Sequence, residues 1–101
     1  MLLYNTTYHV EQDRVDLFLI WLKEKFIPEV KANGLLANPR VYKVLSHLEE
    51  GVESYCLQWD VENSGTLHRW YTAQGAELNE ELVRTFQDKV MGIPTLMEEV
   101  G

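Results

Sequence analysis

Apolar and polar side chains alternate along the first ten residues of the chain. One side of this stretch carries Leu2, Tyr4, Thr6, Tyr8 and Val10, and the other carries Leu3, Asn5, Thr7 and His9. A period of two residues places these sets on opposite faces of a β-strand. The stretch therefore predicts a strand with one more apolar and one more polar face.

The apolar positions then change to helical spacing. From about Asp13 they are Val15, Phe18, Leu19, Leu22 and Phe26, with Leu17, Ile20 and Trp21 widening the stripe. Gln12 or Asp13 is the expected start of the helix. Pro28 lacks a backbone N–H and disfavours helical geometry at the residue before it, which predicts a kink. Asn33-Gly34 predicts the end of the helix, because glycine adopts the left-handed conformation without steric cost.

The rest of the chain predicts two more strands, a second helix and a final strand. The strands are expected at 40–48 and 53–61, joined by a turn at 49–51. Asn63 or Ser64 is the expected cap of the second helix. Its apolar face is formed by Leu67, Trp70, Tyr71, Leu78, Leu82, Phe86 and Val90, with a bend expected at Gly75. Gly92 is expected to end the helix, and 93–100 to form the last strand.

The order β-α-β-β-α-β predicts a ferredoxin-like α+β fold, a single domain over residues 1–101 with an antiparallel sheet of strand order 4-1-3-2. Both helices then cover one face of the sheet, and the other face is open. Asn5, Thr7, Cys56 and Gln58 fall on the open side of the two central strands. This mixture suits neither an ideal solvent face nor a core, so we expect these four residues to lie in the interface of a homodimer.

Composition and charge exclude several classes of protein. The net charge of −7 and the absence of a basic patch argue against a nucleic-acid partner. The longest apolar run, 17–22, is too short to cross a bilayer, so no membrane association is expected. The first residues lack the features of a signal peptide, and we expect a cytoplasmic location.

We expect neither a metal nor another cofactor. His9, His47 and His68 are predicted at separate places in the fold, too far apart to share one ion. Cys56 is the only cysteine, and a lone cysteine inside a strand is usually a small buried apolar residue. The run of Glu77, Glu80 and Glu81 is typical of the wet face of an amphipathic helix. No residue is assigned a catalytic role.

Aromatic side chains are the more promising candidates for a ligand site. Their phases turn them toward the space between helices and sheet, and the candidates for a ligand pocket there are Tyr4, Trp21, Phe26, Trp59, Trp70 and Tyr71. Indole and phenol rings hold planar ligands by stacking. The other interpretation, in which the rings only fill the core of a thin domain, is the one that we favour for this cluster.

Several segments together resemble a bacterial family of short proteins of unknown function. They are LLYNTTYHV, WLKEKFIPEVKANGLL, RVYKVL, SYCLQW and the Asn63-Ser64 helix start. That family belongs to the dimeric α+β barrel superfamily, which is ferredoxin-like. The resemblance implies relatives that include antibiotic-biosynthesis-type monooxygenases that need no cofactor, heme-degrading monooxygenases and muconolactone isomerases.

The sequence departs from the patterns of these relatives at informative positions. Phe26 and Gly75 stand where the family often has histidine. Heme-degrading relatives combine an asparagine, a tryptophan and a histidine; Trp70 matches the second, but Thr6 and Glu80 stand at the other two positions. The heme pattern is therefore broken, and no heme is expected.

These observations favour a small dimeric module without an assigned activity, and they leave open whether it binds a small apolar or aromatic ligand between helices and sheet. The alternative, from a different class, is a cofactor-independent monooxygenase or isomerase acting on a small aromatic or polyketide-like substrate in the same place. Such an enzyme needs a base or hydrogen-bond donors that converge in the cavity.

Overall fold

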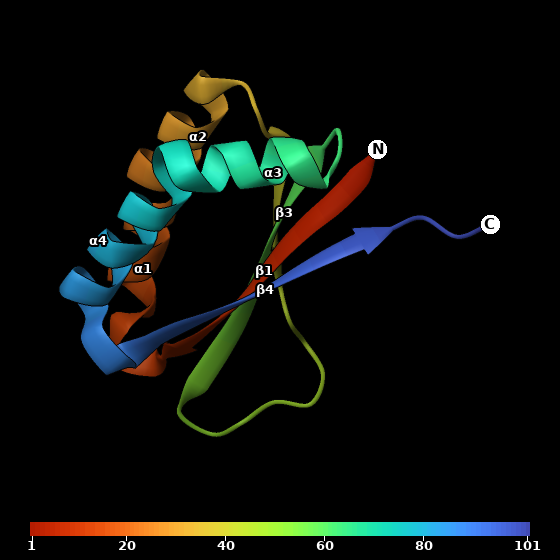
Figure 1. The fold of residues 1–101 in the computed structure, drawn as a ribbon. Helices are drawn as coiled ribbons and strands as arrows, with labels where there is room; N and C mark the ends of the chain where they lie inside the picture. Colours follow the sequence, from red (N-terminus) through yellow and green to blue (C-terminus); the bar gives the residue numbers. More distant parts are fainter.

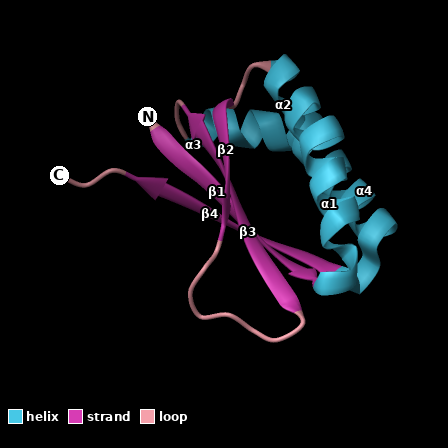
Figure 2. Ribbon diagram, turned by 180° about the vertical axis from the view of Figure 1, so that it is seen from behind, coloured by secondary structure: helices cyan, strands magenta, loops and turns pink.

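The computed structural model describes residues 1–101 as one four-stranded antiparallel sheet with helices on a single face (Figures 1 and 2). The strands are β1 (Leu2–Glu11), β2 (Ala37–Lys43), β3 (Val52–Val61) and β4 (Val90–Glu98). Their order across the sheet is β2-β3-β1-β4. This is the predicted order read from the other edge, so the ferredoxin-like fold is confirmed.

The two central strands are paired over their whole length, from Leu2 opposite Val61 to Glu11 opposite Val52. Directly opposite residues in an antiparallel pair point to the same face of the sheet. This register places the apolar side of β1 and the apolar side of β3 under the helices. The predicted alternation of 2–10 and of 53–61 is therefore confirmed.

The first helical segment begins later than expected. A 3-10 turn, Gln12–Arg14, precedes α1 (Val15–Trp21), and no side chain caps it. A π-helical turn, η2 (Leu22–Phe26), and then α2 (Ile27–Asn33) continue the same column (Figure 1). Gly34 has φ +83° after α2, which confirms the predicted helix end.

The predicted departure of Ile27 from helical geometry ahead of Pro28 is wrong. Ile27 has φ −60° and ψ −47°, and its N–H bonds to the carbonyl of Leu22, five residues back. The wider π turn shifts the hydrogen-bond register just before the proline, whose missing N–H would otherwise interrupt an α-helix. The proline is accommodated by one wide turn without a break.

The second helical segment has the same three parts. α3 (Ser64–Trp70) is followed by a π-helical turn, η3 (Tyr71–Gly75), and by α4 (Ala76–Phe86). The Asn63 side chain accepts a hydrogen bond from the N–H of Thr66 at 2.8 Å, so the predicted cap is confirmed. The segment changes direction between α3 and α4, as predicted for Gly75, although its backbone stays helical (Figure 1).

Two predicted strands have different bounds. The strand expected at 40–48 is β2, which begins at Ala37 across an irregularity at Asn38 with φ +55° and ends before an irregular loop. The strand expected at 93–100 is β4, which starts at Val90. Gln87, with φ +54°, stops α4 at Phe86, a 3-10 turn (Gln87–Lys89) follows, and Gly92 lies inside the strand instead of ending the helix.

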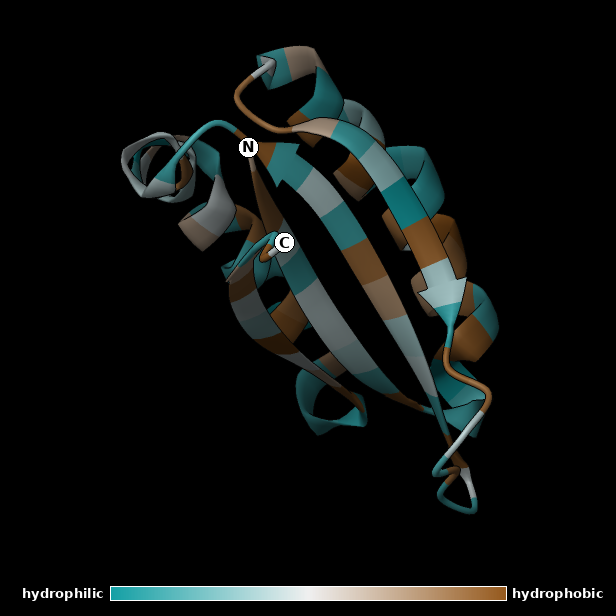
Figure 3. Cartoon of the chain, turned by 90° about the vertical axis from the view of Figure 1, so that its right-hand side faces the viewer, coloured by the Kyte–Doolittle hydropathy of each residue, from teal (hydrophilic) through white to brown (hydrophobic).

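The core lies between the covered face of the sheet and the two helical segments. Its most enclosed side chains include Phe18, Leu22 and Val30 from the first segment and Leu57 and Trp59 from β3. The opposite face of the sheet is uncovered (Figure 3). None of the helices is both long enough and apolar enough to span a lipid bilayer.

Candidate functional site: a cavity between helices and sheet

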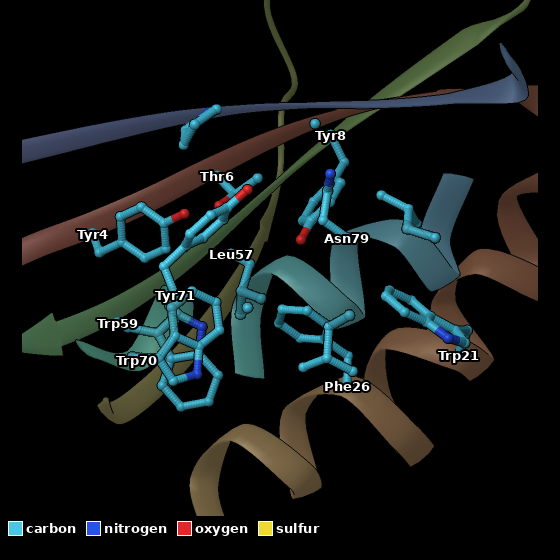
Figure 4. Close-up of a pocket in the computed structure, with 15 residues that line it drawn as sticks. Tyr4, Thr6, Tyr8, Trp21, Phe26, Leu57, Trp59, Trp70, Tyr71 and Asn79 are labelled. Carbon is cyan, nitrogen blue, oxygen red and sulfur yellow. The ribbon is translucent and has the colours of Figure 1, made fainter. Parts of the chain in front are cut away.

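A cavity of about 200 Å³ lies between the covered face of the sheet and the helical segments (Figure 4). Fifteen residues line it, ten of them hydrophobic. The six aromatic residues that the sequence puts forward all belong to this lining: Tyr4, Trp21, Phe26, Trp59, Trp70 and Tyr71. Some of these rings are fully packed, and a cavity still lies between them.

The rings differ in exposure, and this difference locates the mouth of the cavity. Trp59 and Trp70 are buried, whereas Tyr71 is 46% exposed. Tyr71, Tyr4 and Pro94 also border a shallow groove between α3 and β4. The cavity is therefore closed by tryptophan at its inner side and reached past Tyr71.

The two π-helical turns supply most of the aromatic wall. Trp21 and Phe26 flank the first turn, with ring centroids 5.2 Å apart. Trp70 directly precedes the second turn and Tyr71 begins it. A π turn adds one residue to the helical repeat and so turns the following side chains to a different direction. Each segment thereby presents two rings to the same space.

Two glycines leave room for rings at the cavity. A Cβ atom on Gly75 would come within 2.6 Å of the Trp70 indole, and a Cβ atom on Gly92 would come within 3.0 Å of the Tyr8 ring. Gly75 has helical φ and ψ, so its backbone makes no demand for glycine. Both positions are small because an aromatic ring occupies the space of their side chain.

Gln74 joins the wall of the cavity to the opposite helix. The indole Nε1 of Trp70 donates to Gln74 Oε1 at 2.9 Å, and Gln74 Nε2 donates to the carbonyl of Glu29 in α2 at 3.1 Å. Nearby, Lys25 and Glu81 form an ion pair between the same two segments. The Trp70 ring is therefore linked, through Gln74, to the first helical segment as well as to its own.

Hydroxyl groups collect at the sheet side of the cavity. Tyr4, Thr6 and Tyr8 project from one face of β1, and Figure 4 shows the hydroxyl ends of Tyr4 and Tyr71 turned toward Thr6. Burial raises the pKa of Tyr4 and of Tyr8 above the usual value for a phenol, and the Thr6 hydroxyl offsets part of this rise in pKa. Both phenols therefore stay protonated near neutral pH.

The lining contains no Asp, Glu, His, Lys, Arg or Cys side chain. Its polar groups are the hydroxyls of Tyr4, Thr6, Tyr8 and Tyr71, the amide of Asn79 and the tryptophan N–H groups. The sequence interpretation missed Thr6 and Tyr8, although they share the phase of Tyr4 on β1. It also missed Asn79, for which the sequence carries no signal beyond its position next to Leu78.

The residues predicted for a dimer face lie together at the centre of the open face of the sheet. Asn5 is directly opposite Gln58, and Thr7 is directly opposite Cys56. Asn5 Nδ2 donates to Thr7 Oγ1 at 3.1 Å, and Thr7 Oγ1 lies 3.5 Å from Cys56 Sγ. Asn5 is only 7% exposed, yet its Oδ1 has no hydrogen-bond partner.

Apolar side chains surround this polar centre on both edge strands. Tyr42 lies opposite Cys56, Ile93 lies opposite Thr7, and Met91 lies opposite His9. They are between 47% and 61% exposed. The open face thus combines an exposed apolar rim with a buried amide oxygen, Asn5 Oδ1, that lacks a hydrogen-bond partner.

The other candidate groups remain separate. His9 Nδ1 lies 2.8 Å from Ser54 Oγ on the sheet, whereas His47 is in the loop after β2 and His68 is in α3. No group of three or more His, Cys, Asp or Glu side chains is arranged to hold a metal ion. Glu80 is exposed and pairs with Arg84 at 3.9 Å, outside the cavity lining.

Residues 1–100 match the family described as Domain of unknown function (DUF4286). The chain belongs to this family. No curated protein matches it in sequence. Phe26 and Gly75, where the resemblance leads one to expect histidine, both line the cavity of this DUF4286 protein.

Solved structures similar to this DUF4286 protein share its fold at low sequence identity. An antibiotic biosynthesis monooxygenase is 14% identical with a TM-score of 0.70, and each chain is covered completely. An ethyl tert-butyl ether D (EthD) family protein from Bacillus halodurans is 12% identical with a TM-score of 0.70, over 99% of this chain and 100% of that one. A dimeric ferredoxin-like protein from an uncultured marine organism is 12% identical with a TM-score of 0.68, over 98% and 97%.

Proposed function

We propose that this protein is a homodimeric module that binds a small aromatic or apolar molecule in the cavity between helices and sheet. The observation that carries the proposal is the cavity itself, which is lined by aromatic rings and by no charged side chain. Ligand pockets are typically concave and apolar, with a few placed polar groups. An apolar cavity of about 150 Å³ is known to hold a benzene-sized molecule. A volume of about 200 Å³ therefore suits one ring with a small substituent.

The open face supports the homodimer. Exposed apolar side chains such as Ile93 and Met91 rim a face on which Asn5 Oδ1 is buried without a partner. A second copy packed there would cover the apolar rim and could donate a hydrogen bond to this oxygen. One structure with the same fold is described as a dimeric ferredoxin-like protein, which agrees with the proposal.

Binding is favoured over catalysis because the lining offers no general base. Its only ionisable groups are phenols, and burial keeps Tyr4 and Tyr8 protonated. The cofactor-independent monooxygenase or isomerase is the second candidate, since the hydroxyls could still donate hydrogen bonds to a substrate. The likeness to an antibiotic biosynthesis monooxygenase is one of fold, at 14% identity, and adds no support for its activity.

Titration of the ¹⁵N-labelled protein with toluene and with indole tests the proposal. We expect saturable shifts at the indole N–H resonances of Trp21, Trp59 and Trp70, because all three rings line the cavity. The backbone amides of Cys56 and Gln58, whose side chains point to the other face, serve as the internal control. The absence of a saturable shift up to the solubility limit of both compounds would count against a ligand site. Incubation of the bound compound with dioxygen, followed by mass spectrometry, separates a carrier from an oxygenase.

A further inference from the structure

Building on the proposed ligand site, we propose that its ligand is an uncharged single-ring compound with one hydrogen-bond acceptor, such as an aryl ketone, and that the hydroxyl of Tyr8 donates to that acceptor. The proposal narrows "aromatic or apolar" to one chemical class. It follows from the state of Tyr8, from the charge of the lining and from the volume of the cavity.

The hydroxyl of Tyr8 borders the cavity, and the one protein group that hydrogen-bonds with it is the hydroxyl of Thr6. The residue is 4% exposed, and it lines the cavity. Tyr55, the other buried tyrosine on this side of the sheet, donates to Glu53 Oε1 at 2.6 Å. Against the larger effect of burial, which raises the pKa of Tyr8, the Thr6 hydroxyl lowers this pKa and therefore acts as a donor to the Tyr8 oxygen, which leaves the Tyr8 proton without a protein acceptor. The Tyr8 hydroxyl is therefore available to a molecule inside the cavity.

The hydroxyl acts as a donor. Burial raises the pKa of Tyr8 well above that of a free phenol, so the proton stays on the oxygen near neutral pH. The ring is held in place, because it packs on Phe18 with centroids 5.0 Å apart and fills the space left by Gly92. A fixed O–H group selects a ligand that offers an acceptor at the matching position.

The absence of charged side chains from the lining argues against an acidic ligand and does not favour a cationic one. No Lys, Arg or His side chain lines the cavity, so a carboxylate would lose its hydration without a counter-ion. No Asp or Glu lines it either, and an ammonium group would meet only aromatic faces and neutral hydroxyls. A neutral carbonyl needs only the one donor that Tyr8 supplies.

Four probes of similar size separate these possibilities in calorimetric titrations: acetophenone, ethylbenzene, benzoate and benzylammonium. We expect acetophenone to bind about tenfold more tightly than ethylbenzene, because ethylbenzene leaves the Tyr8 hydroxyl unpaired. We expect benzoate and benzylammonium to bind at least about tenfold more weakly than acetophenone. The carbonyl ¹³C resonance of labelled acetophenone should shift on binding in the way that follows hydrogen bonding to its oxygen.

The matched variants are Tyr8→Phe and Tyr55→Phe. Tyr8→Phe removes a hydroxyl whose proton is donated to no protein group, so the fold is retained, and the preference for acetophenone over ethylbenzene should fall about tenfold, to near equality. Tyr55→Phe removes a hydroxyl outside the cavity and should leave the preference unchanged.

Each outcome separates this inference from the proposed function. Equal binding of acetophenone and ethylbenzene overturns the acceptor class and leaves the cavity as a ligand site. Tighter binding of benzoate or of benzylammonium overturns the neutral class in the same way. Failure of all four probes overturns both proposals. A preference for acetophenone that survives Tyr8→Phe overturns the role of Tyr8.

Discussion

The indole of Trp70 occupies the space that a side chain on Gly75 would need. A Cβ atom there would come within 2.6 Å of the ring, and two further ring atoms would lie within 3.1 Å. Gly75 is buried in the middle of a helical segment, where glycine is otherwise unfavourable by about 1 kcal/mol relative to alanine. The position is therefore fixed by packing against a cavity wall, and this has measurable consequences.

Gly75→Ala should destabilise the protein despite the better helix propensity of alanine. The new methyl group must displace the Trp70 ring, and overpacking of this kind costs about 1–3 kcal/mol. In a Trp70→Ala background the same change should be neutral or stabilising by about 1 kcal/mol, because the clash is absent. Chemical denaturation of the four proteins of this double-mutant cycle measures the coupling. A Gly75→Ala protein as stable as the parent would contradict the reported contact.

Trp70→Ala should cost about 3–5 kcal/mol of unfolding free energy, since the ring is 97% buried and one wall of the cavity is lost with it. Toluene and indole should also bind more weakly. Tyr71→Ala is the control, because Tyr71 lines the same cavity but is 46% exposed. We expect it to cost far less stability. A Trp70→Ala protein that unfolds more easily but binds both compounds as before would show that the ring is core and no part of a site.

Cys56→Lys should weaken the homodimer. The residue lies at the centre of the open face, and a lysine there would place an unpaired charge in the proposed interface. Light scattering after gel filtration should give about twice 11.8 kDa for the parent protein and a lower mass for the variant at micromolar concentration. Ala73→Lys adds the same charge at an exposed helical position and should leave the mass unchanged. A parent protein that runs as a monomer would refute the dimer.

Alkaline pH should destabilise the protein in part through Tyr55. Burial and the adjacent Glu53 carboxylate raise the pKa of Tyr55 to about 12, against 10.0 for a free phenol. A pKa that is higher in the folded state means that stability is fully present below pH 10 and is lost as the pH rises toward 12. Two pKa units correspond to about 2–3 kcal/mol.

Tyr55→Phe isolates this contribution. Thermal or urea unfolding between pH 8 and 12 should show a shallower fall in stability for the variant, although it loses the bond to Glu53, worth about 1 kcal/mol, at neutral pH. Every other ionisable side chain is present in both proteins, so the difference between the two curves reports the Tyr55 hydroxyl. Parallel curves would exclude the predicted shift of its pKa.

The strand faces and the topology could be predicted because they follow from local periodicity. The alternation from Leu2 to Val10 fixes which side chains share a face, and Asn63 identifies the start of a helix through a bond to its own third neighbour. The same phase argument brings Trp59 and Tyr4 to one side of the sheet, where both line the cavity. The face of its own strand or helix on which a side chain lies can therefore be predicted from the sequence.

The π turns and the empty space between the rings could not be predicted. A periodicity of 3.6 residues does not distinguish an α-helix from one that contains a π turn, so Pro28 predicts a kink but not the π turn that precedes it. The cavity depends on distances between side chains from three strands and both helical segments, for example between Tyr8 on β1 and Gly92 on β4. Such distances follow only from the assembled structure. The lack of a hydrogen-bond partner for Asn5 Oδ1 could likewise not be predicted from the sequence.

Gln74 makes two hydrogen bonds, one with the Trp70 indole and one with the Glu29 carbonyl, and together they restrain the inner wall of the cavity. Rotating the indole away from the cavity breaks the first bond, and moving Gln74 with it breaks the second. The binding surface is thus pre-organised, because little side-chain entropy is lost when an aromatic ligand packs against Trp70. The same wall does not adapt its shape to a thicker ligand. A rigid wall selects ligands by their shape. The ligand exchanges with solvent past Tyr71, which is exposed at the entrance of the cavity.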